Sequence, residues 1–317
     1  MKQSVDLTIV IPCYKSKNNI KNVIDEIDKA FKDRNTYEIV LVNDCSPDET
    51  YEVLKQIAET RNDIIAIDLA KNVGQHAALM AGFHYASGKL IATCEDDGQT
   101  NLCVFPEMMD KINKEGFDVV APKSLSREQP GAFRHFGSYM ARMMSKWLIE
   151  KPEGVSCGVI FMAKRFVIEE MIAYRQPYPY ISGLVFRTTY NVGNVDSLQK
   201  GRLSGKSGYN FSKLLNLWLN GFTAFSIKPL RISSFIGIVS AIIGFVMGII
   251  LVIRKLIGKG VPQGWTSSIA VMLFMFGLVL FVLGMIGEYI GRIYMCINQT
   301  PQYVIRQVYE SQTGIQE

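Results

Sequence analysis

Three carboxylates stand side by side at Glu95-Asp96-Asp97, directly after the apolar run KLIAT and before Gly98-Gln99. Side chains two apart on an extended segment point the same way, so Glu95 and Asp97 are expected to share a face while Asp96 points elsewhere. Clustered carboxylates at a strand end suit Mg²⁺ or Mn²⁺, which prefer oxygen ligands and keep positions open for phosphate oxygens. Acids are also common in ordinary polar turns. The cluster therefore indicates either a divalent metal site or a turn.

A second polar segment, NDCSPD at residues 43–48, follows the apolar run YEIVLV. The Asp44 carboxylate could accept hydrogen bonds from a nucleobase or a ribose. Alternatively, the segment forms an Asx turn in which Ser46 or Asp48 caps the next helix. The two interpretations are compatible, because different side chains carry them.

The segment KGRLSGKSGY at residues 200–209 is basic and rich in glycine. It is not a P-loop, because that motif needs four residues between its glycines and only three separate Gly201 from Gly205. Arg202, Lys206 and Ser207 remain suited to closing over a diphosphate or a lipid phosphate. A solvated linker is the alternative.

The first 125 residues must position these groups, and they alternate between two patterns. Short apolar runs (TIVIP, YEIVLV, IIAIDLA, KLIAT) are followed by segments with helical spacing. Continuous apolar strands separated by helices predict a mostly parallel sheet covered by helices on both faces. Ligands bind such sheets at the carboxyl ends of the strands. There the chain places Pro12-Cys13-Tyr14, Asn43-Asp44 and Glu95-Asp96-Asp97.

Two uncharged apolar segments, residues 232–253 and 266–287, are each long enough to cross a bilayer as a helix. The short link between them holds Gly and Pro, which predicts a transmembrane hairpin with both chain termini on one side. The chain shows no signal peptide, and its six cysteines have no zinc-ligand spacing. We therefore expect a cytoplasmic domain at residues 1–230, a hairpin at 231–291 and a cytoplasmic tail at 292–317.

The net charge of +5 is mild. It fits an anionic membrane surface or phosphate ligands better than a long nucleic-acid footprint, so no nucleic-acid partner is expected. Aromatic, Met and basic residues interleave at helical spacing over about 128–150 and 209–230, which predicts helices lying in the membrane interface or, alternatively, helices packed on the sheet. Glycines four apart at Gly244 and Gly248, and at Gly287 and Gly291, could pack membrane helices within one chain or in a homo-oligomer.

Seven motifs in order resemble the polyprenyl-phosphate glycosyltransferases of the dolichyl-phosphate mannose synthase type, which are inverting family-2 enzymes with the GT-A fold. Together they span nearly the whole chain. They are TIVIPCY (8–14), LVNDCSPD (41–48), KNVGQHAAL (71–79), EDDGQ (95–99), RLSGKSGY (202–209), NGFTAFSIKPLR (220–231) and GEYIGRIY (287–294).

The resemblance implies transfer of a sugar from a UDP- or GDP-linked donor to polyprenyl (undecaprenyl) phosphate at the cytoplasmic membrane face, for modification of cell-envelope glycans. Asp97 and Arg202 would be the catalytic residues, and Asp97 and Gln99 would hold Mg²⁺ or Mn²⁺. The remaining roles fall to two groups. The nucleotide would contact Pro12, Tyr14, Asp44, Glu95 and Asp96, and the phosphates or the acceptor would contact Lys123, Arg134, Lys206 and Ser207.

The sequence departs from the family pattern in three places. Glu95 stands where the first acid is usually Asp, Gly208 replaces a Lys, and Lys15-Ser16-Lys17 replaces an acidic cluster. These departures leave the donor sugar and its base open. They also keep two other interpretations in view, namely a non-catalytic membrane scaffold with a decayed transferase domain and a processive polysaccharide synthase. A synthase would need a longer membrane channel and a QxxRW motif, which the sequence lacks.

Overall fold

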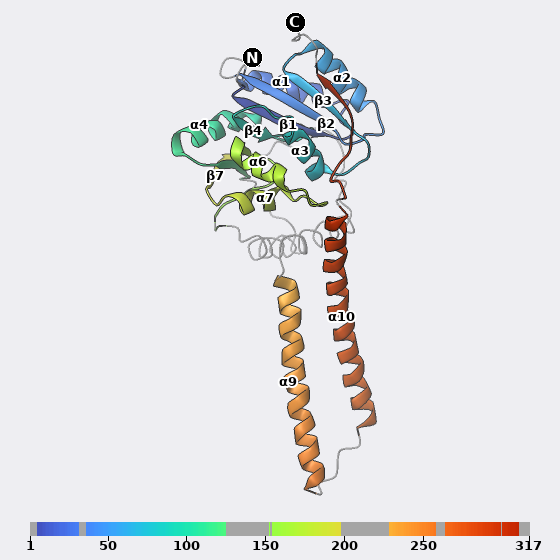
Figure 1. The fold of residues 1–317 in the computed structure, drawn as a ribbon. Helices are drawn as coiled ribbons and strands as arrows, with labels where there is room; N and C mark the ends of the chain where they lie inside the picture. Colours follow the sequence, from blue (N-terminus) through green and yellow to red (C-terminus); the bar gives the residue numbers. More distant parts are fainter. Residues whose placement is uncertain are drawn as a thin grey trace. The chain divides into compact units, whose positions relative to one another are not determined.

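The computed structural model describes residues 5–31, 36–124, 152, 154–197, 228–257, 264–298 and 300–310. These fall into two compact units (Figure 1). The first comprises residues 1–209 together with 299–317, and the second comprises residues 210–298.

A mixed sheet of eight described strands forms the centre of the first unit, in the order β7-β5-β6-β4-β1-β2-β3-β8. The pairs β4-β1, β1-β2, β2-β3 and β5-β7 are parallel, whereas β6 and β8 run antiparallel to their neighbours. The strands are β1 (Leu7–Cys13), β2 (Tyr37–Asn43), β3 (Ile64–Leu69), β4 (Leu90–Thr93), β5 (Val119–Ser124), β6 (Met162–Lys164), β7 (Val192–Ser197) and β8 (Ile305–Glu310).

One face of the sheet packs against α1 (Ile20–Phe31), α2 (Thr50–Thr60) and α4 (Phe105–Glu115), the last preceded by the short 3₁₀ helix η1 (Leu102–Val104). In α1 the buried side chains recur at Ile20, Val23, Ile24, Ile27 and Phe31, which is the spacing of one helical face. Alternate β1 residues, beginning with Leu7 and Ile9, enter the same core. The period-two strand pattern and the helical pattern therefore meet in one layer.

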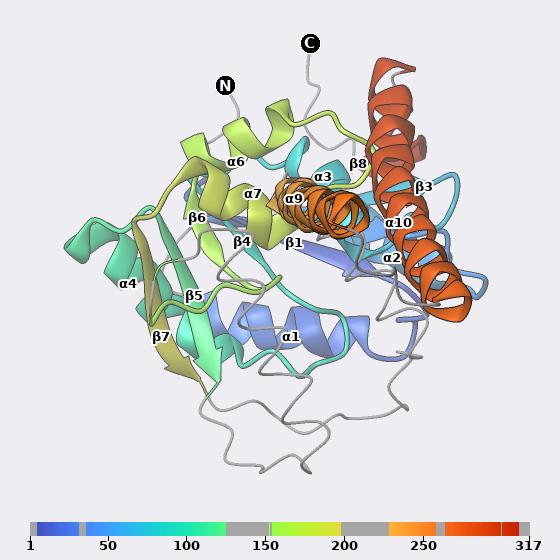
Figure 2. The same ribbon diagram turned by 90° about the horizontal axis from the view of Figure 1, so that it is seen from below.

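The opposite face packs against α3 (Gln75–Phe83), which contacts α6 (Arg165–Ala173), and α6 contacts α7 (Ile181–Thr188). Figure 2 shows this layer on the side of the sheet opposite α1. The α3 helix approaches the strands closely at Gly82, because a Cβ there would lie 2.3 Å from Cγ1 of Val10. Glycine at this position lets the helix seat on the sheet.

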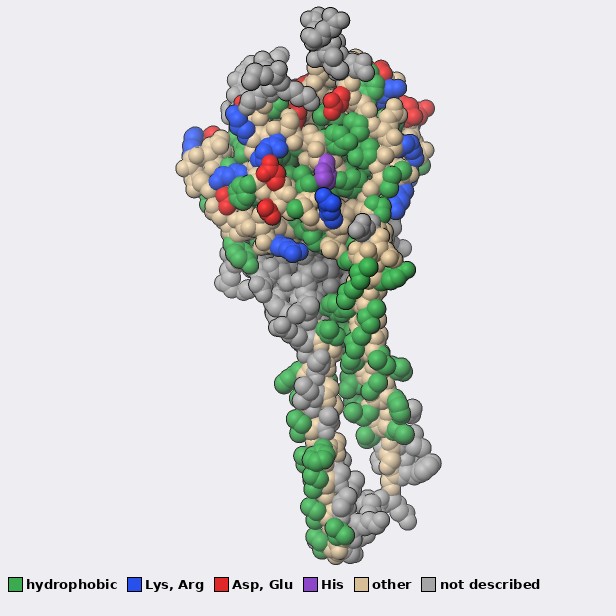
Figure 3. All heavy atoms as spheres, in the orientation of Figure 1, with side chains coloured by type: hydrophobic (Ala, Val, Ile, Leu, Met, Phe, Trp, Pro, Cys, Tyr) green, Lys and Arg blue, Asp and Glu red, His purple; other side chains and the backbone are tan. Residues whose placement is uncertain are grey.

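The second unit consists of α9 (Lys228–Leu256) and α10 (Trp265–Ile297). Where their side chains are described, large apolar groups are exposed along both helices (Figure 3). Within the described residues, one stretch is long and apolar enough to cross a membrane: Phe274–Ile297, with 24 residues and a mean hydropathy of 1.9. A shorter apolar stretch runs from Phe235 to Val246. The second span expected at 266–287 overlaps the stretch in α10, and the first, expected at 232–253, overlaps the shorter one. The bounds of both spans stay predictions.

The segment after α10 differs from the expectation of a simple tail. Residues 305–310 return to the sheet as β8, which pairs with the edge of β3. The interface helices expected at about 128–150 and 209–230 lie outside the described residues.

Candidate active site

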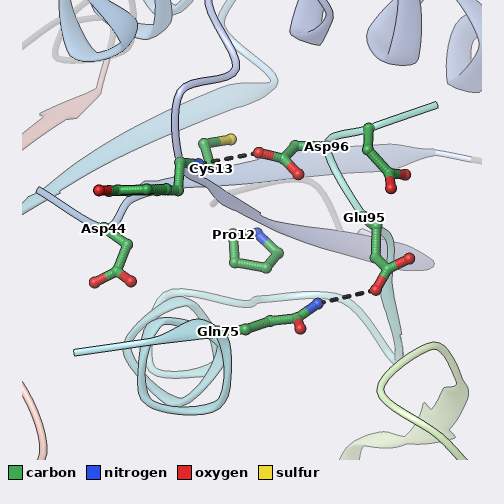
Figure 4. A pocket seen from close by; sticks show the side chains of 8 residues that line it. Pro12, Cys13, Asp44, Gln75, Glu95 and Asp96 are labelled. Carbon is green, nitrogen blue, oxygen red and sulfur yellow. Dashed lines mark hydrogen bonds between the residues drawn. The ribbon is translucent and has the colours of Figure 1, made fainter. Parts of the chain in front are cut away.

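The carboxyl ends of three parallel strands converge on one cavity of about 210 Å³. The register places Cys13 of β1 beside Asn43 of β2, and β4 ends alongside β1 at Thr93. The chain therefore leaves all three strands at the same end of the sheet, and side chains that follow these strands surround the cavity (Figure 4). The cavity is lined by Pro12, Cys13, Tyr14, Asp44, Gln75, Glu95, Asp96 and Asp97.

Asp44 follows β2 and joins two loops. Its carboxylate oxygens accept hydrogen bonds from the backbone N–H groups of Val73 (2.7 Å) and Gly74 (2.9 Å), and the Asn72 amide donates to its carbonyl (3.0 Å). Gly74 has φ of 85°, a conformation that favours glycine, just before α3 begins. Asp44 is 4% exposed and lines the cavity. Its carboxylate therefore fixes the 72–74 loop, and Asp44 also lines the cavity.

Asp96 holds the loop that follows β1. One of its oxygens accepts the Tyr14 N–H at 3.0 Å and the Ser16 hydroxyl. Tyr14 remains 46% exposed, and the Lys15 ammonium lies over its ring, 5.5 Å from the centroid. Residues 96–97 form a turn after β4 has ended at Thr93, so the alternation expected for an extended segment does not apply there. All three acids of the cluster line the cavity.

Glu95 and Asp97 approach different amides. Glu95 accepts from the Gln75 side chain at 3.2 Å, whereas Asp97 accepts from the backbone N–H (3.0 Å) and the side chain (2.6 Å) of Gln99. Gly98, between Asp97 and Gln99, has φ of 72°, which lets the chain turn back on itself. The pair Asp97 and Gln99 expected from the sequence is thus in contact.

The donor set at this turn fits a divalent ion. Among the described residues, no three His, Cys, Asp or Glu side chains gather closely enough to hold one alone. Mg²⁺ commonly takes only one or two carboxylates and completes its shell with substrate phosphates and water. Turning the Gln99 amide over would direct its oxygen to the side where its nitrogen now meets Asp97. Asp97 and Gln99 would then offer two oxygen ligands.

The site is strongly acidic. Asp44, Glu95, Asp96 and Asp97 all line it, and none of the described residues that line it is a Lys or an Arg. Burial raises the pKa of Asp44, against the two backbone N–H groups that lower it. Burial likewise raises the pKa of Asp96, while Ser16 and Tyr14 lower it. An anionic ligand therefore needs a cation between it and these carboxylates.

A histidine lies beside the cavity at the start of α3. His76 Nδ1 accepts the Ile181 N–H at 3.4 Å, and its ring lies 5.4 Å from the Tyr180 ring between centroids. Burial lowers the His76 pKa to about 4, so the imidazole is neutral at pH 7. With Nδ1 accepting, the ring proton is on Nε2.

The remaining residues expected from the sequence separate into two groups. Lys123 lies exposed on β5 near its carboxyl end, opposite Asp196 of β7 in the ladder, and does not line the cavity. Arg134, Arg202, Lys206 and Ser207 lie outside the described residues. Their expected roles at phosphates stay predictions.

The cavity also contains two residues, Gln75 and Cys13, to which the sequence assigned no role. Gln75 belongs to the motif KNVGQHAAL, where the glycine before a helix could have signalled a ligand-facing N-terminus. Cys13 lies between Pro12 and Tyr14, and burial raises its thiol pKa. A buried thiol of this kind is a wall residue and not a nucleophile.

The fold and the site define a class. A mixed sheet with helices on both faces and an acidic cavity at the carboxyl ends of its strands is GT-A-like. The glycosyl transferase family 2 profile matches residues 8–172, which include all the described residues that line the cavity. The chain belongs to glycosyl transferase family 2. A second profile, the GtrB C-terminal hairpin, matches residues 228–293.

Two curated relatives match almost from end to end. The uncharacterized glycosyltransferase YkcC of Bacillus subtilis is 30% identical over 310 residues, covering 98% of this chain and 96% of YkcC. The undecaprenyl-phosphate 4-deoxy-4-formamido-L-arabinose transferase of Yersinia enterocolitica is 34% identical over 310 residues, covering 95% of this chain and 93% of the relative. The resemblance to polyprenyl-phosphate glycosyltransferases drawn from the motifs is confirmed.

A solved structure supports the fold. Glucosyl-3-phosphoglycerate synthase from Mycobacterium tuberculosis, in complex with Mn²⁺, UDP-glucose and phosphoglyceric acid, superposes with a TM-score of 0.51. The match covers 70% of this chain and 79% of the synthase, at 15% sequence identity.

Proposed function

We propose that this protein transfers a sugar from a nucleotide-sugar to polyprenyl phosphate, with undecaprenyl phosphate as the acceptor, at the cytoplasmic face of a membrane. The observation that carries the proposal is the acidic cavity at the strand ends, set in a chain that aligns almost fully with an undecaprenyl-phosphate transferase. The product would be a polyprenyl-phosphate-linked monosaccharide for cell-envelope glycans.

The donor site is assigned to the cavity. Tyr14 would stack on the base, and Asp44 would accept from the base or the ribose. The diphosphate would lie toward Asp97 and Gln99, where four carboxylates leave no place for an anion without a counter-ion. Mg²⁺ or Mn²⁺ bound there would neutralise the diphosphate and assist its departure. The Mn²⁺ complex of the mycobacterial synthase motivates this choice.

The acceptor needs no strong general base. The second pKa of a phosphate monoester is about 6, so the lipid phosphate is largely a dianion at neutral pH and is already a nucleophile. The protein must hold two anions together in line, a task that we assign to Lys123, Arg134, Arg202 and Lys206, with Ser207 as a hydrogen-bond donor. Attack opposite the departing diphosphate inverts the anomeric centre.

A lipid acceptor requires a membrane location. The apolar stretch of α10 and the match to the GtrB C-terminal hairpin support membrane anchorage. We propose that α9 crosses the membrane as the other arm of a hairpin with α10. The chain before α9 and the chain after α10, including β8, would then be on the same side of the membrane. All six cysteines are free in the structure. Free thiols favour the reducing, cytoplasmic side of the membrane.

The test uses the full chain in detergent with undecaprenyl phosphate. Nucleotide-linked sugars are offered one at a time, including donors of 4-deoxy-4-formamido-L-arabinose, the sugar named for the Yersinia relative. Mass spectrometry then identifies any lipid-linked sugar. A single sugar per lipid that appears only with both substrates supports the proposal. A polymer would indicate a processive synthase, and no turnover with any donor would indicate a scaffold.

A further inference from the structure

The chain that follows α10 is fastened to the first unit at several points. The Gln302 amide donates to the carbonyls of Tyr174 (2.7 Å) and Gln176 (2.8 Å). The Tyr303 ring meets the His84 ring edge-on, with centroids 6.1 Å apart. The Ala70 N–H donates to the Val304 carbonyl at 2.8 Å, directly after β3 ends. Residues 302–304 thus reach the strand end from which the 72–74 loop departs.

The β8 strand then pairs with β3, and its register shifts once. Asp68 is opposite Gln307 while Leu69 is opposite Ile305, so Arg306 is an extra residue in the ladder. A bulge of this kind redirects the side chain that it carries, and bulges are frequent beside active sites. Here it directs Arg306 across the strand end, where Nη1 donates to Asp68 (2.8 Å) and Nη2 donates to the Ala70 carbonyl (3.1 Å).

The buried partner of Arg306 connects it to the cavity. Asp68 is 3% exposed, and its second oxygen accepts from the Asn43 amide at 2.7 Å. The Asn43 oxygen accepts the Ser46 N–H at 3.2 Å, and the Ser46 hydroxyl accepts the Lys15 N–H at 3.0 Å. A line of hydrogen bonds therefore runs from β8 through the ends of β3 and β2 to the loop after β1.

Both loops that frame the proposed nucleoside site are tied into this line. Asn43 precedes Asp44, and Lys15 follows Tyr14. The Ala70 carbonyl held by Arg306 begins the segment whose Val73 and Gly74 N–H groups donate to Asp44. The Arg306 guanidinium is the charged end of this line of hydrogen bonds. Its positive charge stabilises the carboxylate of Asp68, which is buried.

We propose that Arg306 is a positioning residue for the nucleotide site, acting through Asp68 and Asn43 to hold Asp44 and Tyr14 in place. The proposal rests on the nucleotide site assigned under Proposed function. Arg306 does not touch the cavity, so its effect would fall on donor affinity and would largely spare the lipid acceptor.

A purely structural role is the alternative, because an Arg–Asp pair could simply fasten an edge strand. The chain offers a matched control at the other end of β3. Arg61, just before that strand, pairs with Asp28 (2.6 Å) and Asp63 (2.6 Å) far from the cavity residues. Its loss should destabilise the unit without moving the cavity loops.

The experiment compares full-length wild type, Arg306→Met, Arg306→Lys and Arg61→Met in detergent. We would measure the dissociation constants of UDP and GDP with Mg²⁺, and the hydrogen exchange of the peptide covering residues 71–75 without nucleotide. Arg306→Met should raise the dissociation constant about fivefold to tenfold, which is less than a full charge-assisted hydrogen bond because Arg306 acts on the site indirectly, and should speed exchange in that peptide. Arg306→Lys, which retains a donor to Asp68, should recover part of both effects.

The outcomes separate the two proposals. Arg61→Met should lower the melting temperature and leave both readouts at wild-type values. If Arg306→Met lowers the melting temperature but changes neither affinity nor exchange, Arg306 only fastens β8 and the inference is wrong. A wild type that binds neither nucleotide overturns the donor site itself, while faster exchange in Arg306→Met would still show that Arg306 orders the 71–75 loop.

Discussion

Acids at the amino ends of the strands have different partners from the acids that line the cavity at the carboxyl ends. At the amino ends of the strands each of three acidic sites has a cation: Asp6 pairs with Lys89 (2.8 Å), Asp118 with Lys164 (2.9 Å), and Asp28 and Asp63 with Arg61. At the carboxyl ends, Asp68 pairs with Arg306 outside the cavity lining. The donors that hold the cavity acids Asp44, Asp96 and Asp97 are backbone N–H groups, a hydroxyl and an amide.

The pKa directions follow this division. Hydrogen bonds from Lys89 and Thr36 lower the Asp6 pKa. Burial works to raise the Asp118 pKa, but Lys164 and Thr189 together bring it below its usual range. Asp44 and Asp96, held by neutral donors, shift the other way because burial dominates. Paired acids at the amino ends stabilise the fold, whereas the cavity at the carboxyl ends keeps negative charge that a bound cation can neutralise.

The largest expected effect is on turnover, at Asp97. Asp97→Asn keeps size and removes charge, so turnover should fall by a factor on the order of 100, as for other lost transition-state charge partners. Asp118→Asn, at the amino end of β5, is the matched control and should turn over normally. Initial rates with and without EDTA, followed by titration of Mg²⁺ or Mn²⁺, test both. Near-normal turnover in Asp97→Asn, or a wild type indifferent to chelator, would remove the metal from the mechanism.

A smaller effect is expected on the acceptor. Lys123→Ala should raise the apparent KM for polyprenyl phosphate by roughly fivefold to tenfold, the loss of one charge-assisted contact, with a smaller change for the nucleotide-sugar. Lys164→Ala, at the opposite end of the same region of the sheet, removes a lysine already paired with Asp118 and should change neither KM. Equal losses for both substrates would move Lys123 to the donor site.

His76 predicts a pH dependence of stability beside the cavity. Its folded pKa of about 4 lies below the usual 6.5, so the unfolded chain binds a proton first on acidification. This stabilising contribution is complete above pH 6.5 and is lost progressively as the pH falls toward 4, with a slope of up to about 1.4 kcal/mol per pH unit. His76→Asn keeps an acceptor for Ile181 and should flatten melting temperature against pH in that window. An unchanged slope would assign the acid sensitivity to other groups.

The smallest expected effect is on the free energy of unfolding, which Asp118→Asn should lower and Asp96→Asn should not. Asp118→Asn breaks a partly exposed ion pair and should lower the free energy of unfolding by roughly 0.5–1 kcal/mol. Asp96→Asn can keep both acceptor contacts on one oxygen while removing a charge that burial disfavours, so stability in EDTA should not fall. Thermal melts of both variants at pH 7 provide the measurement. A clear loss in Asp96→Asn would show that its charge itself holds the Tyr14 loop.

The sequence predicted the part of the fold where pattern and packing agree. The strands β1 to β4 are buried runs, and their ends bring together Pro12, Tyr14, Asp44 and the three acids as expected. The hydrogen bonds that Asp96 accepts from Tyr14 and Ser16 were not predictable, because these partners are about 80 residues away in the chain. The expected alternation of side-chain directions from Glu95 to Asp97 was also wrong. Such alternation holds for strands, whereas Asp96 and Asp97 form a turn.

The β8 strand was missed for a physical reason. Its sequence IRQVYE is half-exposed at a sheet edge and carries no continuous apolar run, and it follows a long apolar helix. What places it is the open edge of β3, which no local pattern in residues 305–310 reveals. The role proposed for Arg306 depends on the same long-range pairing, so its position in the sequence alone gave it no structural role.

The late position of β8 in the chain has a consequence for biosynthesis. β3 ends at Leu69 and its partner ends at Glu310, so the ribosome adds 310 − 69 = 241 residues between them, which takes roughly 12–50 s at about 5–20 residues per second. Throughout that interval β3 presents unpaired backbone groups, a known route to aggregation. A chain cut short before Ile305 would retain this open edge permanently. Such truncated chains are expected to aggregate although every residue that lines the cavity has been made.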